Sequence, residues 1–154
     1  KHLEVSDFDP VFMDEVNKSA SNDWVDDVFV LDLTLNPADK KYNGIYCLDV
    51  FEHIDRNVEN NFLHNICQSL SPDGCVIIGI PSLESQAIIP KDKRDPGHVN
   101  CKSGSDFKEI LSQYFENVFM FSMNDEVVHT GHHEMAHYLL GVCCMPKARV
   151  KKND

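Results

Sequence analysis

Short apolar runs and longer apolar stripes alternate along this chain. Residues 45–48 and 75–80 form two short apolar runs, whose lengths suit strands covered on both faces of a sheet. Between them, apolar side chains recur about every four residues, which predicts a helix with one buried face. The stripe consists of Val58, Phe62, Leu63, Ile66, Cys67 and Leu70. A strand, a helix and a second strand in this order predict a right-handed βαβ unit with parallel strands.

The first thirty residues and the middle of the chain complete the first half of the predicted fold. Residues 3–7 and 28–31 are expected as strands, and residues 11–19 as a helix with Pro10 in its first turn. Residues 82–102 are polar and too long for a tight connection. We expect them to form either a functional lid or a mobile surface loop.

The last third of the chain predicts one helix and two more strands. Apolar residues within 107–115 follow helical spacing, and Ser103 and Asp106 are placed to cap the helix. Residues 118–123 and 136–145 are expected as strands. The alternation of strands and helices predicts an α/β sheet with an antiparallel strand pair at its end.

Composition restricts the class of protein. The chain has 154 residues, 42% hydrophobic and 25% charged, which predicts one soluble domain, over residues 1–146, with a basic tail at 147–154. No apolar run approaches the roughly 18 residues that span a bilayer, and the start does not resemble a signal peptide. We therefore expect a cytoplasmic protein without membrane contact.

Charge and cysteine usage exclude two further classes. The formal net charge of -11 argues against general nucleic-acid binding, because phosphate contacts need clustered Lys and Arg. The six cysteines contain no CxxC pair, so neither a disulfide framework nor a cysteine zinc site is expected. Buried free thiols are the favoured interpretation.

The sequence DVFEHI at residues 49–54 supplies the most specific motif. It ends a predicted strand, and a helix, the sequence LSPDG at residues 70–74, an apolar strand and Pro81 follow it. Together these motifs resemble the class I S-adenosylmethionine-dependent methyltransferases, the Rossmann-like group, from about Leu3 to Pro146. The resemblance implies a mostly parallel methyltransferase sheet, S-adenosylmethionine as cofactor, and methyl transfer to a small-molecule substrate, with oxygen the expected acceptor.

The resemblance also implies which residues bind the cofactor. Asp7 corresponds to the acid that accepts hydrogen bonds from the ribose hydroxyls, and a carboxylate suits this role with its two acceptor oxygens. Phe8 corresponds to the residue that packs against adenine. Asp32 corresponds to the acid that receives the adenine amino group, with Leu33 beside it. Asp49 would border the methyl-transfer centre.

His53 and His98 are the catalytic candidates that the resemblance places near the substrate. The unperturbed pKa of histidine, about 6.5, would let His53 accept a proton from a substrate hydroxyl near neutral pH. Asp49, Glu52, His53 and His98 could instead bind a divalent ion, since carboxylates and imidazoles are suitable donors. We favour histidines that line the cofactor pocket, and the prediction contains no metal.

A second histidine motif, His133-Glu134-Met135-Ala136-His137, matches the H-E-x-x-H pattern of zinc peptidases. That mechanism needs both histidines on one helical face and a third ligand downstream. The segment is expected to enter a strand, and after it the only acid is Asp154, with no further histidine. A zinc metallopeptidase is therefore the least favoured of the functions considered.

Two departures from the family pattern matter. Asp73 replaces the first glycine of the usual PGG, which predicts a type I turn ending at Gly74. The family's first strand and glycine-rich loop have no counterpart, because Gly44 is the first glycine. We therefore expect the sequence to be the C-terminal portion of a longer protein. Direct pairing of residues 3–6 with residues 45–48 in one sheet would contradict this. If the chain is complete, a non-catalytic methyltransferase-like binding or scaffold domain is the alternative.

Overall fold

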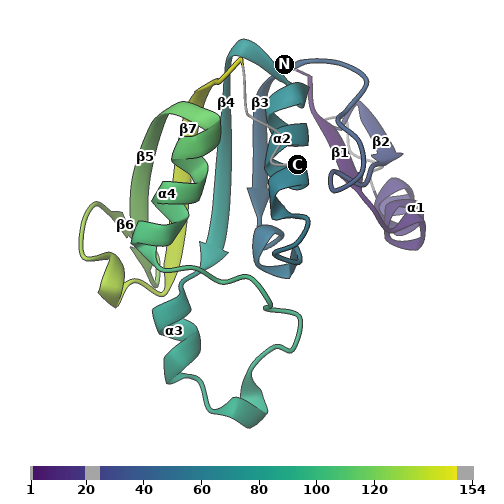
Figure 1. Cartoon of the computed structure of the whole chain (residues 1–154). Helices are drawn as coiled ribbons and strands as arrows, with labels where there is room; N and C mark the ends of the chain where they lie inside the picture. Colours follow the sequence, from purple (N-terminus) through teal and green to yellow (C-terminus); the bar gives the residue numbers. More distant parts are fainter. Residues whose placement is uncertain (1, 20–24, 149–154) are drawn as a thin grey trace.

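The structure is a computed structural model that describes residues 2–19 and 25–148 (Figure 1). Most of the predicted basic tail, including Arg149, Lys151 and Lys152, lies outside the described residues. Lys147 is described, and its Nζ donates to the Ser112 carbonyl oxygen at 2.7 Å. None of the helices in the described part of the chain is long and apolar enough to cross a membrane.

A small parallel unit opens the chain. It contains β1 (Glu4–Asp7), α1 (Pro10–Ser19) and β2 (Asp27–Val30). The two strands pair in parallel, and Asp9 Oδ1 caps the helix by accepting from the backbone N–H of Val11 at 2.8 Å. All three elements were predicted from the sequence to within one residue at each end.

The predicted βαβ unit forms the edge of a second sheet. It consists of β3 (Tyr42–Leu48), α2 (Glu59–Ser69) and β4 (Leu70–Pro81), with the strands parallel. Residues 71–74, where a type I turn ending at Gly74 was predicted, lie within the bounds of β4 but pair with no strand of the described chain. Tyr42 lies opposite Leu70 and Gly44 opposite Cys75, so β4 carries extra residues as a bulge.

The remaining elements extend this sheet in the order β3-β4-β7-β5-β6. Strand β7 lies antiparallel between β4 and β5, so the sheet is mixed as expected. Strand β6 was not predicted from the sequence, and neither were two helical segments within residues 82–102. The element bounds are α3 (Leu83–Ile88), η2 (Lys91–Lys93), α4 (Gly104–Tyr114), β5 (Phe115–Asn124), β6 (Val127–His129), η3 (His133–Met135) and β7 (Tyr138–Pro146).

The β1–β2 pair is a separate sheet (Figure 1). Within the described residues no strand pairs with the outer edge of β3, and residues 3–6 do not pair with residues 45–48. Strand β1 pairs with β2 instead, so the structure does not contradict the expectation that a first strand is missing. The expectation that the sequence continues toward the N-terminus stays a prediction.

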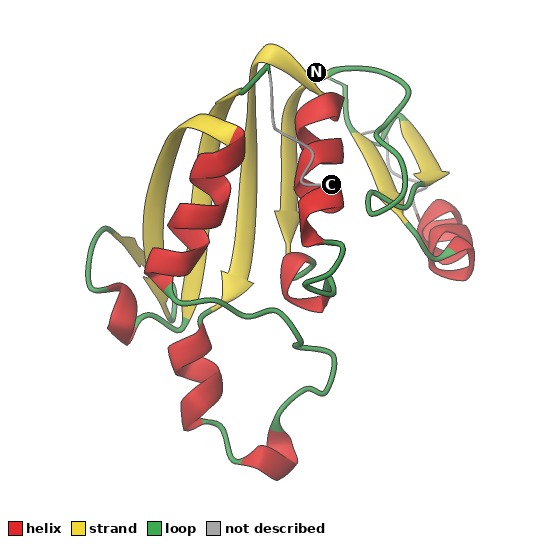
Figure 2. Cartoon of the chain, in the orientation of Figure 1, coloured by secondary structure: helices red, strands yellow, loops and turns green. Residues whose placement is uncertain are grey.

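In the described residues, helices cover only one face of the five-stranded sheet. Helices α2 and α4 lie on the same face (Figure 2) and bury Ile66 and Leu111 completely. On the other face, Tyr46, Ile77 and Phe119 are exposed, and the register places Tyr46 beside Ile77. The prediction that the strands of the βαβ unit are covered on both faces is therefore wrong.

The prediction of buried free thiols holds for four of the six cysteines. All six are free thiols, and Cys47, Cys67, Cys101 and Cys143 are buried. Burial raises the pKa of the Cys47 and Cys67 thiols to about 12, which keeps both protonated at neutral pH. Cys75 and Cys144 are half-buried neighbours on β4 and β7. The four buried thiols therefore serve packing, whereas the Sγ atoms of Cys75 and Cys144 lie within hydrogen-bond distance, 2.8 Å apart.

Candidate functional site

The site begins where β3 ends. Asp49 directly follows the strand and has a φ of 54°, the left-handed region that Asp tolerates better than most residues. Its backbone N–H lies 3.2 Å from both the Gly79 carbonyl oxygen and the Tyr138 hydroxyl. The chain therefore turns sharply here and enters the short 3-10 helix η1 (Phe51–His53).

Phe51 anchors η1 to the hydrophobic core. Its side chain is fully buried, and its ring centroid lies 6.0 Å from that of Phe62 on α2 and 5.9 Å from that of Phe107 on α4. The next two residues, Glu52 and His53, are therefore held at the carboxyl end of β3, the edge where open α/β sheets bind ligands.

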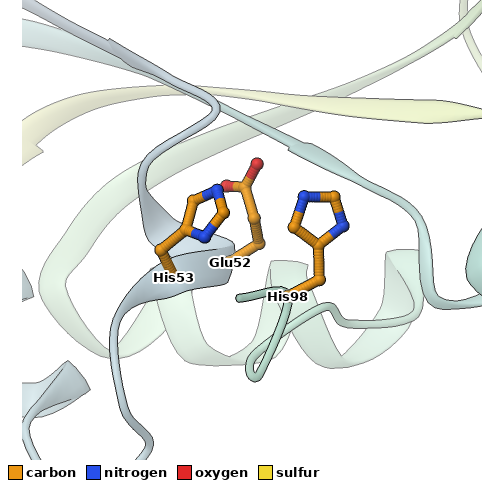
Figure 3. Close-up of side chains that lie close together, drawn as sticks. All are labelled: Glu52, His53 and His98. Carbon is orange, nitrogen blue, oxygen red and sulfur yellow. The ribbon is translucent and has the colours of Figure 1, made fainter. Parts of the chain in front are cut away.

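The structure brings His98 to Glu52 and His53. The three side chains come from η1 and from the loop after β4, and their ligand atoms lie within 4.8 Å of one another. The imidazole centroids are 5.0 Å apart with an interplanar angle of 67°. Figure 3 shows the Glu52 carboxylate between the two rings. Asp49 does not belong to this group.

Local hydrogen bonds orient both histidines. His53 Nδ1 lies 3.0 Å from the Gly97 carbonyl oxygen, and His98 Nδ1 lies 3.1 Å from Gln86 Oε1 on α3. Asp95 Oδ1 fixes the turn before His98 by accepting from the Gly97 N–H at 2.7 Å. Residues 82–102 therefore contact the site through the Gly97 carbonyl oxygen at His53 and through the Gln86 side chain of α3 at His98.

A buried polar network joins η1 to the same loop. Asn100 is fully buried, and its N–H donates to the Glu52 carbonyl oxygen at 2.8 Å. Its side-chain amide donates to Glu59 Oε2 at 2.9 Å, and Lys102 Nζ contacts the same carboxylate oxygen at 2.8 Å. This network fixes the distance between η1 and the His98 loop. Neither Asn100 nor Lys102 was recognised in the sequence, because single polar residues in a long polar stretch carry no distinguishing pattern.

A cavity of about 340 Å³ lies between the small β1–β2 unit and β3. It brings together four of the five residues predicted to bind the cofactor and one predicted catalytic residue. These are Asp7, Phe8, Asp32, Leu33 and His53. Asp49 and His98 are not among its lining residues. Phe8 is 69% exposed, so its ring is available to a ligand. Residues distant in sequence thus meet in one cavity.

The two carboxylates in the cavity are held by their own loops. Asp7 Oδ1 accepts from the Asp9 N–H at 2.9 Å, and Asp32 Oδ1 accepts from the Thr34 N–H at 2.8 Å and the Thr34 hydroxyl at 2.6 Å. No hydrogen bond within the described chain uses the Oδ2 atom of either residue. Each acid is therefore oriented and keeps one oxygen for a ligand.

The H-E-x-x-H segment does not form a metal site in the described residues. His133 and Glu134 lie on the 3-10 helix η3, whereas His137 precedes β7, so the two histidines are not on one helical face. His133 Nδ1 lies 2.9 Å from the Ser122 hydroxyl. In the described chain the only group of three residues with metal-ligand spacing is Glu52, His53 and His98. The geometry of this segment gives the zinc peptidase hypothesis no support.

Solved structures match nearly the whole chain, although no protein-family model and no curated protein does. A S-adenosylmethionine-dependent methyltransferase from Clostridium acetobutylicum ATCC 824 is 12% identical, with a TM-score of 0.72, over 94% of this chain and 75% of its own. The N-methyltransferase NodS from Bradyrhizobium japonicum WM9, solved with S-adenosyl-L-homocysteine, is 16% identical with a TM-score of 0.65. The match covers 95% of this chain and 67% of NodS. An O-methyltransferase family protein from Burkholderia thailandensis is 12% identical with a TM-score of 0.66. The match covers 95% of this chain and 44% of that protein.

Proposed function

We propose that this chain, whose fold is that of the class I S-adenosylmethionine-dependent methyltransferases, binds S-adenosylmethionine and transfers its methyl group to a small molecule. One observation carries the proposal. Asp7, Phe8, Asp32 and Leu33, which the family pattern assigns to the adenosine, line one cavity of about 340 Å³ together with His53.

The residues present fit the adenosine part of the cofactor. Asp7 and Asp32 each keep an oriented carboxylate oxygen, which suits the ribose hydroxyls and the adenine amino group. The exposed ring of Phe8 and the side chain of Leu33 offer apolar surfaces for the base. A pocket lined mostly by apolar side chains with a few fixed polar groups is the usual form of a cofactor site.

The substrate would lie toward His53 and His98. The Gly97 carbonyl can only accept, so His53 Nδ1 carries the proton and Nε2 is free to take one from an acceptor hydroxyl. The cofactor, when bound, supplies an electrophilic methyl group on a sulfonium. Transfer depends mainly on alignment, which the anchoring of η1 by Phe51 provides. The similar structures include an N-methyltransferase, so they do not decide which atom accepts the methyl group. The proposal of an oxygen acceptor therefore rests on His53 alone.

A non-catalytic methyltransferase-like domain is the second candidate. The observation that favours it is the separation of the β1–β2 pair from β3 within the described residues. The family pattern assigns the methionine end of the cofactor to a glycine-rich loop.

Calorimetric titration separates the two candidates. We expect S-adenosylhomocysteine to bind the purified chain with one site and a dissociation constant in the micromolar range, because the adenosine residues are already assembled. Adenosine alone should compete for the same site. No heat and no competition at millimolar ligand would rule out the cofactor proposal for this chain and favour the scaffold.

A further inference from the structure

The carboxylate of Glu52 is buried without a hydrogen-bond partner. The residue is 0% exposed, and neither Oε1 nor Oε2 has a partner in the described part of the chain. A carboxylate that is buried without a hydrogen-bond partner destabilises the fold unless a cation or a donor compensates for its charge. Burial raises the pKa of the Glu52 carboxyl, but the neutral acid would still leave a donor and an acceptor unpaired. Proton uptake alone therefore does not satisfy this group.

Two imidazoles lie against the buried carboxylate. The ligand atoms of Glu52, His53 and His98 are all within 4.8 Å of one another, and Figure 3 shows the rings on either side of the Glu52 oxygens. Donor atoms that surround one ion at about 2.0–2.2 Å cannot be more than about 4.4 Å apart. Small side-chain movements would therefore bring all three donors to a common ion.

The hydrogen bonds behind the rings select the tautomer that a metal needs. His53 Nδ1 and His98 Nδ1 each face an oxygen, of the Gly97 carbonyl and of the Gln86 side chain, at 3.0 and 3.1 Å. The Gly97 carbonyl can only accept, so His53 Nδ1 donates and its Nε2 keeps a lone pair. His98 offers Nε2 to an ion in the tautomer whose Nδ1 donates to Gln86, and Asp95 Oδ2 lies 3.8 Å from that Nε2. A backbone or side-chain oxygen behind each ring is the usual support of a metal-binding histidine.

We propose that Glu52, His53 and His98 bind a divalent transition-metal ion. Two imidazoles and one carboxylate suit Mn²⁺ or Zn²⁺, whereas Mg²⁺ prefers a shell of oxygen ligands. Three protein donors leave coordination positions open for water or a substrate oxygen. Because His53 also lines the 340 Å³ cavity, the ion would lie next to the proposed cofactor site. Binding of the ion does not depend on the proposed methyl transfer, but it would occupy the Nε2 lone pair of His53, so His53 would not act as the base while the ion is bound.

Metal titration of the full chain tests this inference. We expect chain stripped with EDTA to bind one Mn²⁺ in the micromolar range, measured by loss of the free Mn²⁺ signal in electron paramagnetic resonance, with Zn²⁺ competing. Glu52→Gln should weaken binding at least about 10-fold, because the only charged donor is lost. His133→Ala is the matched control, since it removes a histidine of the H-E-x-x-H segment, and it should bind as the parent chain does.

Thermal unfolding separates loss of the site from loss of the fold. In EDTA, Glu52→Gln should melt at or above the temperature of the parent chain, because it removes an unpaired buried charge. Added Mn²⁺ should raise the melting temperature of the parent chain and not that of the variant. His53→Ala should likewise lose the Mn²⁺-dependent increase.

Three results would overturn the inference: no Mn²⁺ or Zn²⁺ bound at millimolar metal, unchanged affinity in Glu52→Gln, or loss of binding in His133→Ala. All titrations are made without cofactor. A chain that binds S-adenosylhomocysteine but no metal therefore contradicts only the metal site, and the reverse result contradicts only the proposed function.

Discussion

Asp32→Asn is expected to lower the affinity for S-adenosylhomocysteine by about 10- to 100-fold, the size of one hydrogen bond to a charged group. Asparagine keeps an Oδ1 that can accept from Thr34, so the loop after β2 should hold its conformation. It replaces the free carboxylate oxygen with an NH₂ group, which cannot accept a hydrogen bond from the adenine amino group. Calorimetric titration measures the difference.

Two controls make the result specific to the amino group. Asp73→Asn changes an exposed acid on β4 and should bind as the parent chain does. S-inosylhomocysteine carries an oxygen in place of the amino group, so its affinity should not fall in Asp32→Asn. An equal loss for both ligands would mean that the substitution damages the pocket and would contradict the assigned contact.

Phe51→Ala is expected to destabilise the chain by about 3–5 kcal/mol, the usual cost of removing a fully buried phenylalanine. The ring packs against Phe62 and Phe107, so its loss leaves a cavity between α2 and α4 that neither neighbour can fill without moving. The lower free energy of unfolding would be measured by urea denaturation followed by circular dichroism.

The same substitution should also affect the site, because Phe51 holds η1 in place. Phe119→Ala on the exposed face of the sheet is the matched control and should change the free energy of unfolding by less than about 0.5 kcal/mol. If Phe51→Ala unfolds at the urea concentration of the parent chain, the anchoring of Glu52 and His53 through Phe51 is wrong.

Local patterns predicted most of the fold. The stripe on α2 and the runs of β3 and β4 follow the periods that packing imposes, and the structure confirms them. Strand β6 was missed because a three-residue strand shows no period. Coverage of β3 and β4 on both faces was predicted from apolar runs, but an apolar run does not reveal what lies opposite it, and Tyr46 and Ile77 are exposed.

The site was predicted in part. Asp7, Phe8, Asp32, Leu33 and His53 were named from the family pattern and line one cavity, whereas their roles stay predictions. The contact of Tyr138 with Asp49 joins residues 89 positions apart, which no local signal reveals. The burial of Glu52 was also missed, because glutamate is seldom fully buried without a partner.

We propose that the cavity between β1, β2 and β3 holds the adenosine of the cofactor, and an amide nitrogen–proton NMR titration with S-adenosylhomocysteine measures this. We expect the largest shift changes at Asp7, Phe8, Asp32 and Leu33, with saturation at one ligand per chain. Changes centred on β5 and β6, or no changes at millimolar ligand, would contradict it.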